Sequence, residues 1–138
     1  MLKVVLDTNC ILSSVSHRSA FRIIIDKLYE AKYELLVSNE ILNEYEEKLS
    51  EIFSSEVAED FIGALLILPN VIFCNIYYKF QLVPSDEEDE KFVDCALAGN
   101  AHFLVSNDKA LLKLKSFSFP YINVISKEQF TKILSVNK

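Results

Sequence analysis

Two aspartates, Asp7 and Asp108, each come directly after a short apolar run that is typical of a buried β-strand. These runs are Val4–Leu6 and Phe103–Val105. If the two strands are parallel, both carboxylates lie at the same edge of the sheet, where a ligand could meet them. Either aspartate alone is equally well explained as a turn residue or a helix N-cap. The two together indicate a site.

Two further acids, Asp94 and Glu44, lie within predicted helices. Asp94 has apolar residues on both sides, and burying an isolated charge is costly without a partner. An aspartate on a narrow exposed stripe is the alternative. Glu44 borders an apolar stripe, although four other glutamates share its helix and such charges usually form a solvated face. From its position beside the stripe, the Glu44 side chain could reach the edge of the sheet.

Four carboxylates at one edge would suit a hard divalent cation such as Mg²⁺ or Mn²⁺, which prefers oxygen ligands. Zinc is disfavoured, because the chain has only two histidines and its three cysteines, Cys10, Cys74 and Cys95, are far apart. One or two hard cations could activate a water molecule and stabilise the leaving oxygen in phosphodiester hydrolysis.

The elements that would position these acids alternate between strand-like and helix-like patterns. The predicted strands are 3–6, 34–37, 102–106 and 123–125, and the segment 71–78 is expected to contain a further strand. The helical patterns between them are 21–28, 38–52, 57–68, 85–99 and 108–114, and a last helix begins at 126. This alternation predicts an α/β fold with a mainly parallel central sheet flanked by helices on both faces.

Two serines are predicted to begin helices through capping boxes. Ser85–Glu88 and Ser126–Gln129 each place an acid or its amide three residues after the serine, and Gly99 is placed to end the first of these helices. Asp94 then falls in the middle of that helix.

The composition fits one globular domain spanning residues 1–138, since half of the chain is hydrophobic and glycine and proline are scarce. The longest apolar segment, 61–73, is interrupted and falls short of the roughly 18 residues of a membrane span. The N-terminus lacks the pattern of a secretory signal. We therefore expect a cytoplasmic protein without a membrane partner, whose cysteines are reduced.

The net charge of -6 argues against an extended basic footprint on nucleic acid. Two divalent cations would add four positive charges where a phosphate would lie. Some basic residues could flank the acids, although a surface location without a role in binding is the commoner explanation: His17, Arg18, Arg22, Lys109, Lys113 and Lys115. The aromatic and aliphatic residues at 61–68 and 117–121 are expected to be core or dimer contacts, and whether the chain forms a homodimer stays open.

Four segments together give the chain a resemblance to the PIN-domain family, and in particular to its bacterial toxin components of toxin–antitoxin pairs. The segments are Val4–Asn9, Ser38–Tyr45, Asp89–Ala98 and Phe103–Leu112. Each is unspecific by itself, and their order and spacing over nearly the whole chain carry the resemblance. It implies a ribonuclease that acts on RNA and is restrained by a small antitoxin protein.

The resemblance also implies roles for individual residues. The acidic quartet around Mg²⁺ or Mn²⁺ would be Asp7, Glu44, Asp94 and Asp108. Asn9 and Ser106 would support the quartet through hydrogen bonds. Asp89 matches an acid that this branch often carries before Lys-Phe, so it is a secondary candidate ligand, and its alternative is a first-turn aspartate that complements the helix dipole. Glu90 departs from the branch, where asparagine is more common.

Other functions fit the sequence less well. A receiver-like switch would need an acidic pair at the end of the first strand, but Leu6 precedes Asp7 and Thr8 follows it. A phosphatase with two aspartates two residues apart is disfavoured because Asn9 stands in the second place. A nuclease that processes RNA without a toxin role stays open, as does a PIN fold that only binds RNA or protein.

Overall fold

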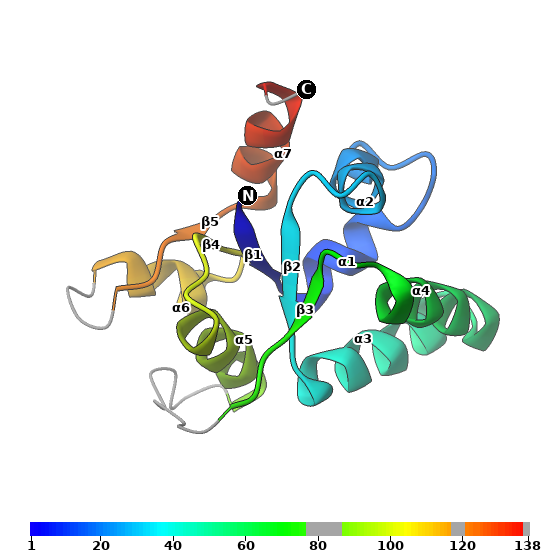
Figure 1. The fold of residues 1–138 in the computed structure, drawn as a ribbon, viewed down its shortest axis with the longest axis horizontal. Coiled ribbons are helices and arrows are strands. Elements are labelled where there is room, and N and C mark those ends of the chain that lie inside the picture. The colour runs from blue at the N-terminus through cyan, green and yellow to red at the C-terminus, as the bar shows by residue number, and fades with distance from the viewer. Residues whose placement is uncertain (77–86, 117–120, 137–138) are drawn as a thin grey trace.

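The computed structural model describes residues 1–76, 87–116 and 121–136, which form a five-stranded sheet with helices around it (Figure 1). The strands are β1 (Lys3–Leu6), β2 (Glu34–Val37), β3 (Val71–Phe73), β4 (Phe103–Val105) and β5 (Val124–Ile125). Their order is β3-β2-β1-β4-β5, and all neighbours are parallel.

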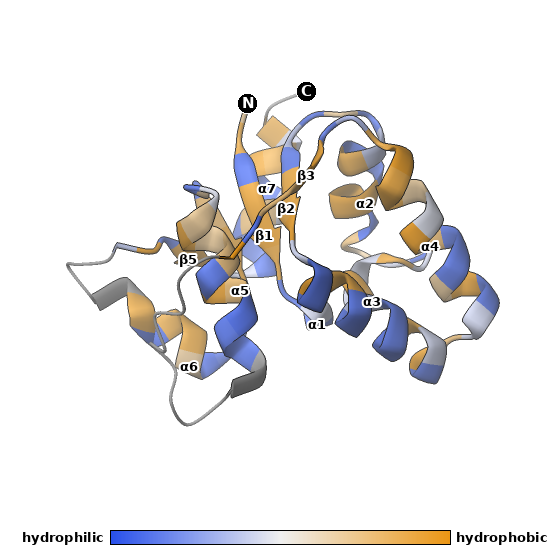
Figure 2. Cartoon of the chain, turned by 60° about the horizontal axis from the view of Figure 1, so that its bottom comes forward, coloured by the Kyte–Doolittle hydropathy of each residue, from blue (hydrophilic) through white to orange (hydrophobic). Residues whose placement is uncertain are grey.

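The helices cover both faces of this sheet. They are α1 (Thr8–Ser14), α2 (Arg22–Tyr29), α3 (Asn39–Ile52), α4 (Ser55–Ile67), α5 (Glu87–Ala98), α6 (Lys109–Leu112) and α7 (Lys127–Val136), with a 3₁₀ helix at Lys113–Ser116. The strand order changes direction between β3 and β4, so right-handed crossovers place α1 to α4 on one face and α5 and α6 on the other (Figure 2). The predicted α/β architecture is confirmed.

β1 lies at the centre of the sheet and fixes where the first aspartate emerges. Val4, Val5 and Leu6 are fully buried, with α5 packed against β1 on one face. Leu6 pairs with Val105 of β4, and the next backbone amide, that of Asp7, donates to the Val105 carbonyl at 3.1 Å. The residues that follow these two strands are therefore side by side.

Two buried tyrosines join the helices to the rest of the fold. The Tyr45 hydroxyl of α3 donates to the Leu6 carbonyl at the end of β1. The Tyr33 hydroxyl donates to the Ile24 carbonyl at 2.7 Å, and its ring meets Phe130 of α7 edge to face. Burial raises the pKa of both tyrosines well above the ordinary value, so both remain donors. Tyr45 thus fixes α3, and with it Glu44, against β1.

Two helix ends that capping residues predicted are confirmed. Ser126 and Gln129 form the predicted reciprocal box, with the Gln129 amide bonded to the Ser126 hydroxyl at 3.1 Å and the Ser126 amide to Gln129 Oε1 at 2.9 Å. The predicted box at 85–88 lies outside the residues whose structure and side chains are described. Gly99 ends α5 as predicted, since its amide donates to the Cys95 carbonyl.

Several boundaries differ from the sequence prediction. Helix α1 was not predicted, because Thr, Asn and Ser are weak helix formers, and the Asp7 cap and packing against α2 and α3 supply what propensity lacks. Strand β3 lies within the segment 71–78 that was expected to contain a strand, and residues 77 and 78 lie outside the described ranges. Of the residues at 61–68 that were expected to be core or dimer contacts, Phe61 and Leu65 belong to the core, whereas Leu66 and Ile67 are exposed. In the second such segment, 117–121, residues 117–120 are not described.

None of the helices in the described ranges is both long enough and apolar enough to cross a membrane.

Candidate active site

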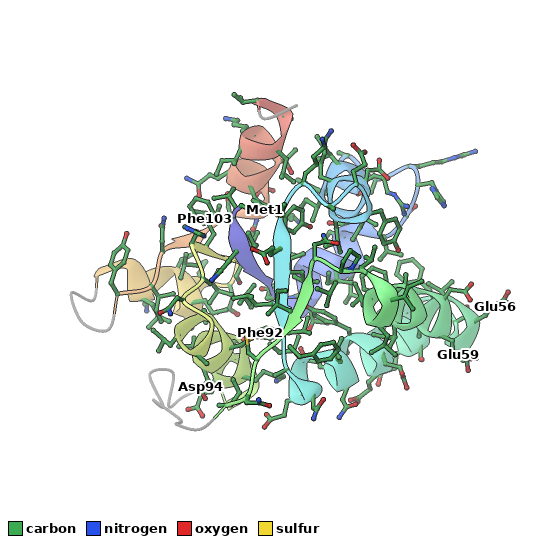
Figure 3. All side chains as sticks on the ribbon, viewed as in Figure 1. Met1, Glu56, Glu59, Phe92, Asp94 and Phe103 are labelled. Atoms are coloured by element: carbon green, nitrogen blue, oxygen red, sulfur yellow. The ribbon has the colours of Figure 1, made fainter. Side chains whose placement is uncertain are left out.

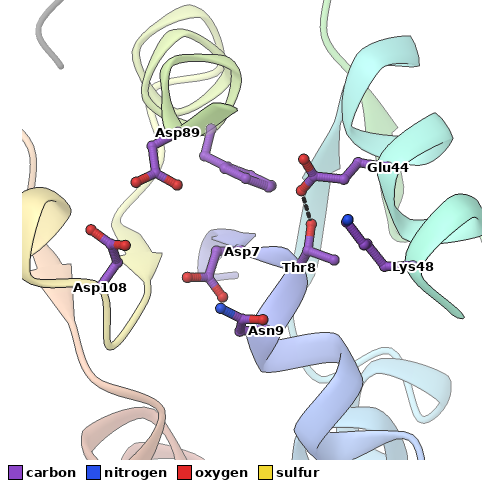
Figure 4. Close-up of a pocket in the computed structure, with 8 residues that line it drawn as sticks. Asp7, Thr8, Asn9, Glu44, Lys48, Asp89 and Asp108 are labelled. Carbon is purple, nitrogen blue, oxygen red and sulfur yellow. Dashed lines mark hydrogen bonds between the residues drawn. The ribbon is translucent and has the colours of Figure 1, made fainter. Parts of the chain in front are cut away.

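The carboxyl ends of β1 and β4 border a pocket of about 110 Å³ that collects carboxylates from four elements (Figure 4). Its lining residues are Asp7, Thr8, Asn9, Glu44, Lys48, Asp89, Phe92 and Asp108. Of the acids that sequence analysis singled out, the structure brings together Asp7, Glu44, Asp108 and the secondary candidate Asp89.

Asp7 is held at the junction of β1 and α1. Its Oδ1 accepts a hydrogen bond from the Cys10 amide at 2.9 Å, which caps α1, and its Oδ2 accepts one from the Ser106 hydroxyl. The residue is only 5% exposed. The N-cap interpretation of Asp7 is therefore confirmed, and the same carboxylate lines the pocket, so the two interpretations are compatible in geometry.

Asp108 repeats this arrangement at the junction of β4 and α6. Its Oδ1 accepts hydrogen bonds from the amides of Ala110 at 2.8 Å and Leu111 at 3.2 Å. Its own amide donates to the Ser106 hydroxyl oxygen at 3.0 Å. Ser106, which is fully buried, thus connects Asp7 to the backbone of Asp108. Asn9, on the first turn of α1, is exposed and lines the pocket.

Glu44 enters the pocket from α3 and is held by two protein groups. The Thr8 hydroxyl donates to Oε2, and the Lys91 ammonium lies 3.0 Å from Oε1. The Glu44 and Lys91 side chains are 16% and 13% exposed, so this ion pair is largely shielded from water. The position beside the apolar stripe of α3 that singled out Glu44 in the sequence does bring it to the edge of the sheet.

Helix α5 presents Asp89 to the pocket, and Asp94, which sequence analysis placed in the quartet, is not among the lining residues. With about 100° of rotation per residue, Asp89 and Phe92 share a face, whereas Asp94 is turned by roughly 140° from Asp89. Figure 3 labels Phe92 and Asp94, which both lie on α5. Asp94 is 4% exposed, so the exposed-stripe alternative for it is wrong. Asp89 is thus the α5 carboxylate that lines the pocket, and a ligand role for Asp94 stays a prediction.

Sequence analysis did not single out Thr8, Lys48 or Phe92 as pocket residues. A helical spacing signal was available for two of them. Lys48 lies four residues after Glu44 and Phe92 three residues after Asp89, so each shares a helix face with a candidate acid. The contact between Thr8 and Glu44 joins α1 to α3 and depends on tertiary structure.

Burial and neighbouring charges shift the pKa of two groups at the pocket, Asp7 and Cys10. Burial raises the pKa of Asp7, hydrogen bonds from Ser106 and Cys10 lower it, and the charge of Asp108 raises it again, with a net upward shift. Burial and the charge of Asp7 raise the pKa of the Cys10 thiol well above its ordinary value. Cys10 is therefore a neutral core thiol beside the site and no nucleophile.

The donor set fits a hard divalent cation. The polar groups lining the pocket are carboxylates, one amide, one hydroxyl and one ammonium, and no histidine or cysteine lines it. Within the described part of the chain, no three His, Cys, Asp or Glu side chains are already close enough to hold a metal. The carboxylates would have to draw closer around the ion, which their mutual repulsion opposes until the ion is present.

A larger cavity of about 610 Å³ lies between α2 and α4. Its lining is mostly apolar and includes the basic residues His17, Arg18 and Arg22. None of the candidate acids lines it, and Arg22 forms an ion pair with Asp26 of its own helix. These three basic residues thus belong to a different depression from the acids.

The raised pKa of Asp7 predicts how the metal-free protein responds to pH. For a carboxyl group with a raised folded-state pKa, the stabilising contribution is complete below the unfolded pKa, about 3.9, and is lost as the pH rises through the folded pKa. Ionised Asp7 therefore costs stability at pH 7, and Asp7→Asn should raise the Tm of chelator-treated protein there. The gain should shrink as the pH falls toward about 4.

Asp60→Asn, which changes an exposed aspartate of α4, is the matched control and should alter the Tm little at either pH. Thermal unfolding followed by circular dichroism at both pH values measures the differences. An Asp7→Asn protein that is less stable than the wild type at pH 7 contradicts the electrostatic interpretation.

Comparison with known proteins finds matches that extend over most of the chain. A family model described as PIN domain matches residues 3–110. A chain in the crystal structure of VapBC2 from Rickettsia felis bound to a promoter DNA fragment has 17% identity and a TM-score of 0.61, covering 91% of this chain and 98% of that one. A chain in the crystal structure of DNA-bound VapBC from Salmonella typhimurium has 14% identity and a TM-score of 0.63, covering 92% of this chain and 99% of that one.

The PIN domain endonuclease Utp24 is also similar, with 22% identity and a TM-score of 0.51, covering 90% of this chain and 84% of that one. No match is found among curated proteins. At these identities the structural likeness is one of fold, and the family model covers most of the chain. The chain belongs to the PIN-domain family.

Proposed function

We propose that this protein is a metal-dependent ribonuclease that hydrolyses RNA phosphodiester bonds at the acidic pocket. The observation that carries the proposal is the convergence of Asp7, Glu44, Asp89 and Asp108 on one pocket at the carboxyl ends of β1 and β4. Membership of the PIN-domain family, whose members are generally nucleases, supports hydrolysis of nucleic acid.

Mg²⁺ or Mn²⁺ would be held by the carboxylates of Asp7, Asp89 and Asp108, with Glu44 as the fourth ligand group. When bound, the ion supplies the positive charge that activates water and stabilises the leaving oxygen in phosphodiester hydrolysis. Two of these four carboxylates, Asp7 and Asp108, are already held in place as helix caps.

Other residues in and beside the pocket would contact the substrate or hold the ligands in place. The Ser106 hydroxyl donates to the Asp7 carboxylate and accepts from the Asp108 amide. Ser106 would therefore hold both aspartates in place. Lys48 is a cation at the pocket and suits contact with a phosphate of the RNA backbone. Asn9 is exposed there and offers an amide to the same substrate.

We further propose that the protein is the toxin of a toxin–antitoxin pair whose small partner blocks this pocket. The fold likeness to chains of the two VapBC structures supports this role. A basic side chain of the partner would pair favourably with the clustered carboxylates once water is excluded. A nuclease that processes RNA without a toxin role is the second candidate, and the fold likeness to the endonuclease Utp24 favours it.

The nuclease proposal predicts cleavage of single-stranded RNA by the purified protein in the presence of Mn²⁺, and loss of cleavage with EDTA. Asp89→Asn should reduce the rate by about 100-fold or more, because removing a ligand charge weakens both ion binding and transition-state stabilisation. Asp94→Asn is the matched control on the same helix and should retain most activity. Gel analysis of RNA, with single-stranded DNA as a second substrate, measures both.

Circular dichroism must show that both variants are folded, since Asp94 is buried. Cleavage that is insensitive to EDTA would exclude the metal mechanism. Loss of activity in Asp94→Asn, with Asp89→Asn still active, would return the ligand role to Asp94. A folded wild type that binds RNA without cutting it would point to a binding module.

The toxin proposal predicts that induced expression in a bacterial host stops growth and degrades RNA, whereas Asp7→Asn at the same protein level does neither. Co-expression of the neighbouring small reading frame should restore growth. Growth curves and total RNA on gels are the measurements. Equal growth and equal RNA patterns in the two strains would reject the toxin role and leave an RNA-processing nuclease.

A further inference from the structure

Lys91 connects the two helices that flank the acidic pocket. It extends from α5 to Glu44 of α3, with 3.0 Å between the ammonium nitrogen and Oε1. Thr8 donates to the other oxygen of the same carboxylate. Both oxygens of Glu44 are therefore engaged by the protein itself, one by a full positive charge and the other by a hydroxyl.

The surroundings give this ion pair more weight than an ordinary surface pair. Both side chains are largely buried, so the attraction is less screened by water and salt. Three further carboxylates, those of Asp7, Asp89 and Asp108, line the same pocket. Without a cation in the pocket, Glu44 would add its charge to theirs, and Lys91 reduces that repulsion.

The same ammonium has the opposite effect on a divalent ion. An ion that takes Oε1 of Glu44 as a ligand must displace Lys91 from that oxygen. If the ammonium stays nearby, it repels the ion. The contact that stabilises the metal-free pocket therefore competes with metal binding.

We propose that Lys91 is a positioning residue that acts as the internal counter-cation of Glu44, stabilising the metal-free pocket and weakening its affinity for the divalent ion. The inference rests on the proposed metal site. The metal concentration at which the pocket fills then depends on the ion pair between α3 and α5 as well as on the ligands. The inference also gives Lys91 a role separate from any contact with RNA.

Lys48 provides a matched comparison. It lines the same pocket and lies near Glu44 in Figure 4, but its ion pair is with Glu51 at 3.6 Å and is more exposed. Removing the charge of Lys48 changes the net charge of the protein by the same amount as removing that of Lys91. The difference between the two variants isolates the contribution of the Glu44 ion pair.

The test compares the full chain with Lys91→Met, Lys91→Arg and Lys48→Met after removal of metals by chelator and dialysis. Thermal unfolding gives the metal-free Tm, and electron paramagnetic resonance of free Mn²⁺ gives the Mn²⁺ dissociation constant. Lys91→Met should lower the metal-free Tm by about 3–8 °C and tighten Mn²⁺ binding by about 3- to 10-fold. Lys91→Arg should resemble the wild type, and Lys48→Met should change Mn²⁺ affinity by less than about 2-fold.

A merely structural role for Lys91 predicts a different pattern, in which Lys91→Met loses Tm and Mn²⁺ affinity together. That result, or equal tightening in Lys48→Met, overturns the proposal. If Lys91→Met does not fold, Lys91→Gln removes the charge while keeping a donor, and the same tightening is required of it. A wild type that binds no Mn²⁺ overturns the proposed metal site itself, whereas a wild type that binds it, with Lys91 variants unchanged, overturns only this inference.

Discussion

Mutual repulsion among carboxylates at one edge of the sheet is the constraint that the rest of the site must satisfy. Asp7 and Asp108 meet it by accepting backbone hydrogen bonds at the starts of α1 and α6. Glu44 meets it through Lys91 and Thr8. Because these three acids are held by groups of their own surroundings, the fold tolerates their closeness without a cation. The upward shift in the pKa of Asp7 shows that burial and repulsion still disfavour its charged form.

The parallel sheet makes this arrangement possible. β1 is buried between β2 and β4, and its pairing with β4 brings Asp7 next to Ser106, which in turn binds the backbone of Asp108. The reversal of strand order between β3 and β4 sends α5 to the opposite face from α3. The pocket therefore receives side chains from both layers of helices, as ligands of such sheets commonly do at the carboxyl ends of the strands.

The sequence predicts those parts of the site that follow from local patterns. Asp7 and Asp108 could be found because each ends an apolar strand, and Glu44 because it borders an apolar stripe. The choice between Asp89 and Asp94 could not be made, since it depends on which face α5 turns toward the pocket. The contact between Lys91 and Glu44 joins helices that are distant in the sequence, so no local pattern indicates it.

The central claim is that the carboxylates of Asp7, Glu44, Asp89 and Asp108 share a divalent cation. A crystal structure of the wild type grown with Mn²⁺, with diffraction recorded at a wavelength where manganese scatters anomalously, tests it most directly. An anomalous peak within the pocket, in contact with Asp7, Glu44, Asp89 and Asp108, is the expected result. A fully occupied peak beside Asp94, or Mn²⁺ bound only at the surface with the pocket empty, would contradict it.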